Sequence, residues 1–408
     1  MHLVIIGNGA AGITAARTAR ELLPSARVTV ISDEPGPAYA RCLIPEVLAG
    51  DRDPRSISFV PPGFYREHRI SLLSGRLVVS LDAVGRRLTL EDGETISYDR
   101  LLVATGASPV LPDWPGADLP GVFTLRTVAQ AATAGEAARR CASAVVAGGG
   151  LVSLKAAWAL KRCGVAEVTV VVKSPHLLVR QLDEQGAALV QRELSRAGIK
   201  FLFGLDLAAI TGGAGGRRQV ELEDGRTLPA GLVLVGKGVR PNVQLVRRAG
   251  GRVGQGITVN ERLETTLPGV YAAGDCVEVQ DLLTGAKTNS ALWTLAVEQG
   301  RIAGCNMAGR PRRYSPPLTR LYAAQFGSVP FVSVGDVRGD GETAAFQKDR
   351  VYRKLCFRED RLVGFIMVGW VERAGIYTAL VRRGRPLGRL KQKLLDGTVS
   401  AADLMVMK

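Results

Sequence analysis

The chain opens with an apolar run that leads into a glycine turn and a helix. Residues 3–6 are all aliphatic, which is typical of a strand buried on both faces of a parallel sheet. Residues 7–12 then read G-x-G-x-x-G, and small and charged residues alternate at helical spacing from 13 to 20. Strand, glycine turn and helix in this order predict a βαβ unit whose turn holds the pyrophosphate of a dinucleotide.

The same pattern occurs a second time. The first unit continues into a strand at 27–31, and a second unit has a strand at 144–147, a glycine turn at 148–150, a helix through 161 and a strand at 168–172. This spaced repeat predicts two dinucleotide-binding domains in one chain. The simplest interpretation is a flavin dinucleotide in the first and a nicotinamide dinucleotide in the second.

The residues that end the second strand of each unit differ in charge. Asp33 and Glu34 follow the first of these strands, and either is placed to accept a hydroxyl of an adenosine ribose. Lys173 stands at the matching position of the second unit. A lysine cannot accept a hydroxyl proton but can pair with a 2′-phosphate, and it is equally compatible with a solvated strand end. The choice between NAD and NADP therefore stays open.

Three further apolar runs end in small or polar residues, as strands do at the ligand-binding edge of a parallel sheet. They precede the Ala104-Thr105-Gly106 segment, Gly238, and Asp275. A helix is expected to begin near residue 292, close behind Asp275. A carboxylate that accepts a hydroxyl, beside a positive helix N-terminus, suits the electron-accepting edge of a flavin.

Length and composition narrow the class of protein. A chain of 408 residues predicts two or three domains. Its net charge of +15 is compatible with nucleic acid, an anionic surface or an acidic protein partner, and also with an ordinary arginine-rich surface. Aromatic residues amount to 5% and are not interleaved with Lys and Arg, which argues against nucleic acid. The six cysteines form no C-x-x-C pair and no metal-ligand spacing with the three histidines, so no metal is expected. A strand from residue 3 and the lack of a long apolar run predict a cytoplasmic protein without a membrane span.

The four motifs together carry a family resemblance. The two glycine turns, Ala104-Thr105-Gly106 and Ala273-Gly274-Asp275, in this order and spacing, resemble the pyridine nucleotide-disulfide oxidoreductases. The closer resemblance is to the branch of NADH oxidases, coenzyme A-disulfide reductases, rubredoxin reductases and the flavin region of nitrite reductase. It implies an α/β fold with two Rossmann-like doubly wound domains, glutathione-reductase-like, plus a C-terminal α+β domain. The implied domains are FAD-binding (1–110 and 240–316), NAD(P)-binding (111–239), and dimerising or partner-docking (317–408).

The resemblance also implies roles for individual residues. Those expected to contact FAD are Gly7, Gly9, Ala11 and Gly12 at the pyrophosphate, Asp33 or Glu34 at the ribose, Val78 at the adenine, Arg41, Ala104, Thr105, Gly106 and Arg126 near the flavin, Asp275 at the ribitol, and Leu292 and Trp293 at the helix start. Those expected near NAD(P) are Gly148, Gly150, Ser153, Lys155, Lys173 and Gly238.

Three residues depart from the family pattern or divide its branches. Ser153 stands where a third glycine is usual, and Lys155 where a glutamate usually lies near the nicotinamide. Cys42 occupies the place of the redox cysteine of the single-cysteine branch, and Arg41 before it would lower a thiol pKa. The surrounding Tyr39-Ala40-Arg41 instead resembles the electron-transfer branch, in which Cys42 would be a bystander.

Two function classes follow. The favoured hypothesis is an FAD-dependent NAD(P)H:acceptor oxidoreductase that exchanges electrons with an acidic iron-sulfur or rubredoxin-like protein, in either direction, including as the flavin subunit of a larger complex. The alternative is a thiol enzyme that uses Cys42, of the coenzyme A-disulfide reductase or NADH oxidase/peroxidase type. A flavin-binding structural subunit is a weaker third hypothesis, which Lys155 and Lys173 encourage. A homodimer formed through 317–408 is compatible with either of the first two.

Overall fold

The computed structural model describes residues 1–212, 218–339 and 341–406 and groups the chain into two compact units. Unit 1 contains Met1–Arg41, Arg55–Ser108 and Val239–Thr319, and unit 2 contains Cys42–Pro54, Pro109–Gly238 and Arg320–Lys408. Within the described ranges, no helix has both the length and the apolar character needed to traverse a bilayer. The division into three domains stays a prediction; in the structure residues 320–408 group with the second nucleotide-binding sheet.

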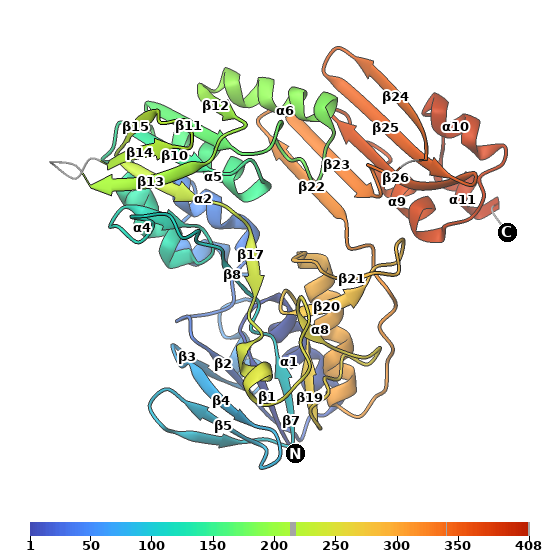
Figure 1. The fold of residues 1–408 in the computed structure, drawn as a ribbon. Helices are drawn as coiled ribbons and strands as arrows, with labels where there is room; N and C mark the ends of the chain where they lie inside the picture. Colours follow the sequence, from blue (N-terminus) through green and yellow to red (C-terminus); the bar gives the residue numbers. More distant parts are fainter. Residues whose placement is uncertain (213–217, 340, 407–408) are drawn as a thin grey trace. The chain divides into compact units, whose positions relative to one another are not determined.

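Unit 1 is built on a five-stranded parallel sheet (Figure 1). In spatial order its strands are β19 (Val270–Ala272), β7 (Arg100–Val103), β1 (His2–Ile6), β2 (Arg27–Ser32) and β3 (Ile70–Ser74). The central strand β1 is completely buried at Leu3, Val4 and Ile5, as its apolar run predicts. Each such side chain contributes about 1.5–3 kcal/mol by leaving water.

The remaining elements of unit 1 frame this sheet. They are α1 (Ala10–Leu22), η2 (Pro54–Ile57), α3 (Phe64–Glu67), β4 (Val78–Asp82), β5 (Arg87–Leu90), β6 (Thr95–Ser97), β8 (Ala107–Pro109), β17 (Val239–Pro241), α7 (Gln244–Arg248), β18 (Ile257–Thr258), β20 (Val277–Gln280), β21 (Lys287–Asn289) and α8 (Trp293–Met307). Helices α1 and α8 pack without intervening side chains, because a methyl group at Gly300 would lie 2.3 Å from the Ala11 carbonyl oxygen. Helix α8 is therefore fixed directly against the first glycine-turn helix.

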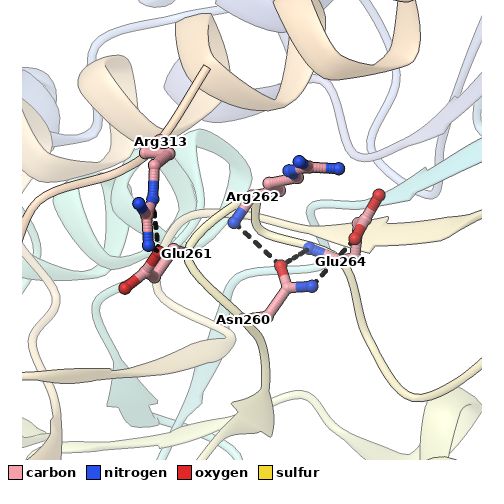
Figure 2. A pocket seen from close by; sticks show the side chains of 5 residues that line it. All are labelled: Asn260, Glu261, Arg262, Glu264 and Arg313. Atoms are coloured by element: carbon pink, nitrogen blue, oxygen red, sulfur yellow. Dashed lines mark hydrogen bonds and ion pairs between the residues drawn. The ribbon is translucent and has the colours of Figure 1, made fainter. Parts of the chain in front are cut away.

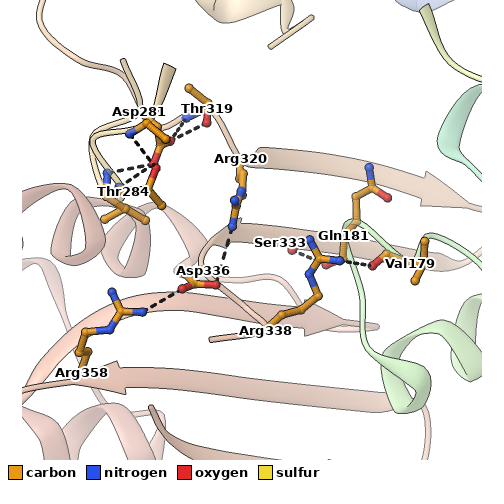
Figure 3. A network of polar contacts seen from close by, with 12 residues as sticks. Val179, Gln181, Asp281, Thr284, Thr319, Arg320, Ser333, Asp336, Arg338 and Arg358 are labelled. Atoms are coloured by element: carbon orange, nitrogen blue, oxygen red, sulfur yellow. Dashed lines mark hydrogen bonds and ion pairs between the residues drawn. The ribbon is translucent and has the colours of Figure 1, made fainter. Parts of the chain in front are cut away.

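A buried carboxylate fixes the end of unit 1. Asp281 accepts hydrogen bonds from the Thr284 amide (2.9 Å) and from both the amide and the hydroxyl of Thr319, as Figure 3 shows. Burial acts to raise the pKa of Asp281, but these hydrogen bonds outweigh it and hold the pKa below its ordinary value. The ionised form of this side chain is thus the one that the fold requires.

Unit 2 contains a second parallel sheet of the same kind. Its strands, in spatial order, are β12 (Ile199–Phe203), β11 (Glu167–Val172), β10 (Ser143–Ala147), β16 (Leu232–Val235) and β9 (Val122–Thr124). Around it lie η1 (Arg41–Leu43), α2 (Ile44–Ala49), α4 (Val128–Ala138), α5 (Leu151–Arg162), α6 (Glu184–Arg196), β13 (Leu207–Gly212), β14 (Arg218–Leu222) and β15 (Thr227–Ala230). Two parallel sheets with crossover helices confirm the predicted pair of Rossmann-like domains.

The C-terminal part of unit 2 is an antiparallel sheet with three helices. Its strands, in spatial order, are β22 (Leu321–Phe326), β23 (Val329–Gly335), β26 (Arg361–Val368), β25 (Val351–Arg358) and β24 (Glu342–Lys348), followed by α9 (Ala374–Arg383), α10 (Leu390–Asp396) and α11 (Ala401–Val406). The central strand β26 is fully buried over four successive residues, 365–368. Both of its faces are therefore covered, which fits the packing of α6 and α9 against this sheet.

Polar contacts join this sheet to the nucleotide-binding part of the same unit. Asp183 caps helix α6 and also accepts a hydrogen bond of 2.6 Å from the Tyr352 hydroxyl, and its carboxylate lies 3.3 Å from the Lys354 ammonium. Ser333 donates to the Gln181 carbonyl beside it (Figure 3). The Asp183 carboxylate thus caps the start of α6 and also binds side chains of the antiparallel sheet.

Candidate active site

The first glycine turn is shaped as a phosphate cradle. Gly7 has φ +114°, and a methyl group on it would lie 2.1 Å from the Ala104 carbonyl oxygen. A methyl group on Gly12 would lie 1.9 Å from the Gly7 carbonyl oxygen, whereas one on Gly9 would meet no protein atom within 4 Å. Two glycines thus allow close packing, while the third leaves its backbone open on the outer side. This is the geometry that a dinucleotide pyrophosphate requires, so the residues fit an FAD site.

Helix starts at the candidate cofactor turns have no side-chain cap. Gly9 at α1, Gly150 at α5 and Leu292 at α8 make no such hydrogen bond. By contrast, α4 and α6 are capped by Thr127 and Asp183. The first backbone N–H groups of α1, α5 and α8 are therefore not satisfied by a capping side chain, and their dipoles favour a bound negative charge.

Asn8, between the glycines of the first turn, is held from two sides. It accepts a hydrogen bond of 2.8 Å from the Tyr65 hydroxyl and donates one of 3.2 Å to the Gly36 carbonyl. The Ala38 amide donates in turn to Tyr65, at 2.9 Å. No sequence motif pointed to Asn8 or Tyr65, because the two residues lie far apart in the chain.

The structure brings Glu34 and Arg41 together. The Glu34 carboxylate accepts hydrogen bonds from the Arg41 guanidinium and from the Tyr39 hydroxyl, while Asp33 is exposed. Burial acts to lower the pKa of Arg41, but the phenol of Tyr39 and the carboxylates of Glu34 and Asp275 outweigh it and raise the pKa. Arg41 is thus electrostatically coupled to the candidate ribose and ribitol residues of FAD.

The Gly274-Asp275 turn is held by two side-chain amides. Gln299 on α8 is 2% exposed, and its Oε1 accepts a hydrogen bond of 2.7 Å from the Gly274 amide. The Asn289 side chain donates to the Asp275 carbonyl at 2.7 Å. No sequence motif pointed to Gln299, and its position in the fold makes it a support for the candidate ribitol residue.

Asn242 supports the Thr105-Gly106 segment. The Thr105 hydroxyl donates to the Asn242 carbonyl at 2.8 Å, and the Asn242 side chain donates back to the Thr105 carbonyl at 2.9 Å. The Asn242 amide also donates to the Gly106 carbonyl, at 2.9 Å. No sequence motif pointed to Asn242 as a support of this segment.

The remaining candidate FAD residues are placed as follows. Val78 is half-buried at the start of β4, and the Trp293 ring meets the Phe59 ring edge-on with centroids 5.1 Å apart. Arg126 belongs to unit 2, where its amide donates to Gln130 at 2.9 Å just before α4. The role of Arg126 at the flavin stays a prediction.

The second glycine turn repeats the first, with one change. Gly148 has φ +116°, and a methyl group on Gly150 would meet nothing within 4 Å. Ser153 is completely buried, and its hydroxyl donates to the Gly236 carbonyl at 3.0 Å. Ser153 therefore packs against the parallel sheet in place of a glycine, because its hydroxyl forms a hydrogen bond with the backbone that follows β16. Gly238, with φ +97°, leaves open space beside it, and the site accommodates a pyridine dinucleotide.

Lys155 is directed to the C-terminal sheet. Its ammonium donates to the Gln325 carbonyl at 2.7 Å and lies 5.1 Å from the centre of the Phe326 ring. Burial lowers the pKa of Lys155, although the Glu46 carboxylate acts in the opposite direction. In this arrangement Lys155 links α5 to β22, and its role toward the nicotinamide stays a prediction.

Cys42 is exposed in η1, two residues before Ile44, the first residue of α2. Burial raises the pKa of the Cys141 and Cys163 thiols, and raises that of Cys276 and Cys356 to about 11. These four cysteines therefore stay protonated near neutral pH.

A polar hollow of about 430 Å³ in unit 1 does not coincide with either glycine turn. It is lined by Asn260, Glu261, Arg262, Glu264 and Arg313 (Figure 2). The Asn260 side chain donates to Glu264 at 2.8 Å, and Arg313 pairs with Glu261. Four of the lining side chains thus bind one another in pairs, and the hollow lies apart from both glycine turns.

Comparison with known proteins defines the class. The model of the pyridine nucleotide-disulphide oxidoreductase family matches residues 1–300. An NADH oxidase of Methanocaldococcus jannaschii is 37% identical over 90% of this chain and 88% of its own length. The assimilatory nitrate reductase electron transfer subunit of Bacillus subtilis is 31% identical over the whole chain, which spans 50% of that protein. The structure of an NAD-dependent persulfide reductase from A. fulgidus superposes with a TM-score of 0.89 and 26% identity, over 96% of this chain and 78% of that one.

The chain therefore belongs to the pyridine nucleotide-disulphide oxidoreductase family. It is an oxidoreductase whose cofactors are FAD and NAD(P), as its motifs predict. The names of its relatives cover both electron transfer and sulfur or oxygen chemistry.

Proposed function

We propose that this protein passes hydride between NAD(P)H and FAD, and electrons between FAD and an acidic iron-sulfur or rubredoxin-like protein. The observation that carries the proposal is the engagement of Arg41 by Glu34 and Tyr39. The cation next to Cys42 in the chain is already balanced, so it gives little help to a catalytic thiolate. Electron transfer through FAD needs no thiolate.

The histidines support the same choice. His2 bonds to Thr29 at 2.9 Å, His68 to the Phe64 carbonyl at 3.0 Å and His176 to the Leu177 carbonyl at 2.8 Å. Within the described residues none of them has a cysteine partner, which a thiol-disulfide mechanism with an imidazole base would use. The name of the B. subtilis electron transfer subunit agrees with this proposal.

The side chains and backbone of this chain bind and orient the cofactors. When bound, FAD exchanges a hydride with the nicotinamide and single electrons with a protein partner. The N–H groups at the start of α1 would hold its pyrophosphate, while the carboxylates of Glu34 and Asp275 would accept hydrogen bonds from its hydroxyl groups. Gln299 and Asn242 keep the two flavin-facing turns rigid. The start of α8 presents a positive dipole that favours negative charge on the reduced ring.

The alternative is a thiol enzyme that uses Cys42. The specific observation in its favour is that Cys42 is exposed at the entrance to α2. The names of the archaeal NADH oxidase and of the persulfide reductase agree with this alternative. It requires Cys42 to change oxidation state in each turnover.

The substitution Cys42→Ser separates the two functions, with Cys305→Ser as a matched control on α8. Under the proposal, flavin reduction by NAD(P)H and ferricyanide reduction stay within about threefold of the wild type, because electrons bypass sulfur. Loss of ferricyanide reduction in Cys42→Ser alone, with FAD still bound and still reduced by NAD(P)H, would make the thiol enzyme the correct assignment.

The expected setting is the cytoplasm. All six cysteines are unpaired, which a reducing compartment preserves. We also propose that the partner docks through opposite charge, because the chain carries +15. A homodimer through 317–408 stays a prediction that a mass measurement in solution decides.

A further inference from the structure

Lys173 is paired with a carboxylate from another strand. It follows β11 directly, and its ammonium lies 3.1 Å from the carboxylate of Glu223, which follows β14. Hydrogen bonding to Glu223 and the charges of Glu223 and Asp206 raise the pKa of Lys173. The lysine that suggested a 2′-phosphate site is therefore already neutralised by Glu223.

Glu223 is held firmly in this position. The second carboxylate oxygen of Glu223 accepts a hydrogen bond of 3.1 Å from the Asp206 amide. The backbone amide of Glu223 donates a hydrogen bond of 3.0 Å to the Asp206 carbonyl. Asp206 follows β12, the neighbour of β11 in the parallel sheet. The carboxyl ends of parallel strands share one edge, so Glu223 stands at the edge where the adenosine half of a dinucleotide binds.

A second ion pair adds to the fixed charges at this edge. Lys237, after β16, lies 2.6 Å from Asp206, and both side chains are mostly buried, at 17% and 13% exposed. Its ammonium also lies 5.4 Å from the centre of the Trp114 ring. Asp206 thus pairs with Lys237. The pair of Glu223 and Lys173 is more exposed, because 45% of the Glu223 side chain and 66% of the Lys173 side chain are accessible to solvent. Both charges are accessible from the solvent.

We propose that Glu223 is the residue that selects NADH over NADPH in this protein. Its carboxylate supplies, from the β14–β15 turn, the ribose acceptor that is missing at position 173. A 2′-phosphate would have to displace Glu223 from Lys173 and would then lie beside its negative charge. This inference rests on the proposed use of a pyridine dinucleotide at the second glycine turn.

Equilibrium binding of NADH and NADPH to the oxidised protein, measured by titration calorimetry, tests the selection. Wild type should bind NADH more tightly than NADPH. Glu223→Gln should tighten NADPH about tenfold and weaken NADH, the size expected for one charge-assisted contact. Glu221→Gln is the matched control, because it removes the same charge from an exposed position on β14, two residues before Glu223, and should change neither affinity.

A double-substitution cycle identifies the lysine that the glutamate masks. Lys173→Gln alone should leave NADPH affinity within about threefold, whereas in the Glu223→Gln background it should remove the whole gain. Unchanged NADPH affinity in Glu223→Gln, or a wild type that prefers NADPH, would overturn the inference while leaving the proposed function intact. Failure of the wild type to bind either nucleotide would overturn both.

Discussion

Glu34 holds the guanidinium of Arg41, the residue that immediately precedes Cys42 in the chain. Tyr39 completes the contact, because its hydroxyl donates to Glu34 and accepts from Arg41 at 3.1 Å. A cation lowers a thiol pKa only to the extent that its charge is not already compensated. Glu34 thus bears on the choice between electron transfer and thiol chemistry, although it lies eight positions before the cysteine.

Glu34→Gln should make Cys42 more reactive, because it removes the charge that compensates Arg41. We expect labelling by iodoacetamide at pH 7 to accelerate about two- to fivefold, since only the thiolate reacts. Mass spectrometry of the Cys42 peptide gives the rate. Glu21→Gln, on the exposed side of α1, removes the same charge from an ion pair with Arg17 and should leave the rate unchanged. Equal rates in wild type and Glu34→Gln would show that the pair does not control the thiol.

Gly12→Ala should destabilise the apoprotein. Its methyl group would lie 1.9 Å from the Gly7 carbonyl oxygen and 3.2 Å from an Ile5 methyl group, so β1 and α1 must move apart. Overpacking of this kind costs about 1–3 kcal/mol in the free energy of unfolding. Urea unfolding without FAD measures the loss, and an unaltered midpoint would contradict the close packing described for this turn.

Gly9→Ala, in the same turn, should leave the stability of the apoprotein nearly unchanged but weaken the binding of FAD. No protein atom lies within 4 Å of the added methyl group, so apoprotein stability should stay within about 1 kcal/mol of the wild type. FAD affinity should fall by about tenfold or more, because the methyl group takes the space beside the pyrophosphate. Fluorescence titration of the apoprotein with FAD provides the measurement. Unchanged affinity would place the pyrophosphate elsewhere.

The sequence predicted what is local and repeated, and missed what joins distant positions. The alternation of strand, turn and helix is written in consecutive residues, so both nucleotide-binding sheets followed from it. The contacts of Gln299 with Gly274 and of Asn242 with Thr105 join residues 25 and 137 positions apart. Lys173 was open to two interpretations because its partner Glu223 lies 50 residues away, after β14 of a separate antiparallel sheet. Only the folded chain places that carboxylate beside the lysine.

The lowered pKa of Asp281 should make the free energy of unfolding depend on pH. Its folded-state pKa lies below the ordinary value, since the hydrogen bonds from Thr319 and Thr284 outweigh burial. The contribution is therefore full well above the ordinary aspartate pKa of about 3.9 and is lost as pH falls through the lower folded-state pKa. Asp281→Asn should cost about 1–3 kcal/mol at pH 7, with a smaller difference from wild type at pH 3.

Urea unfolding of both apoproteins at the two pH values tests this dependence. Asp118→Asn is a suitable control, because Asp118 is exposed and the change should stay within about 0.5 kcal/mol at either pH. A cost for Asp281→Asn that is the same at pH 3 and pH 7 would mean that the ionised carboxylate contributes nothing beyond its shape.

The excess of positive charge predicts how electron transfer responds to salt. If the chain, at +15, docks an acidic iron-sulfur protein, long-range attraction raises the association rate, and ions screen it over about 10 Å at 0.1 M ionic strength. Raising ionic strength from about 0.02 to 0.2 M should therefore slow reduction of the protein acceptor by about tenfold under second-order conditions. An uncharged quinone has no such attraction to lose, so its reduction should change by less than about twofold. Stopped-flow mixing of the NADH-reduced protein with each acceptor separates docking from the internal step. A protein acceptor whose rate rises with salt would instead indicate an apolar docking surface, and the net charge would then have no part in partner choice.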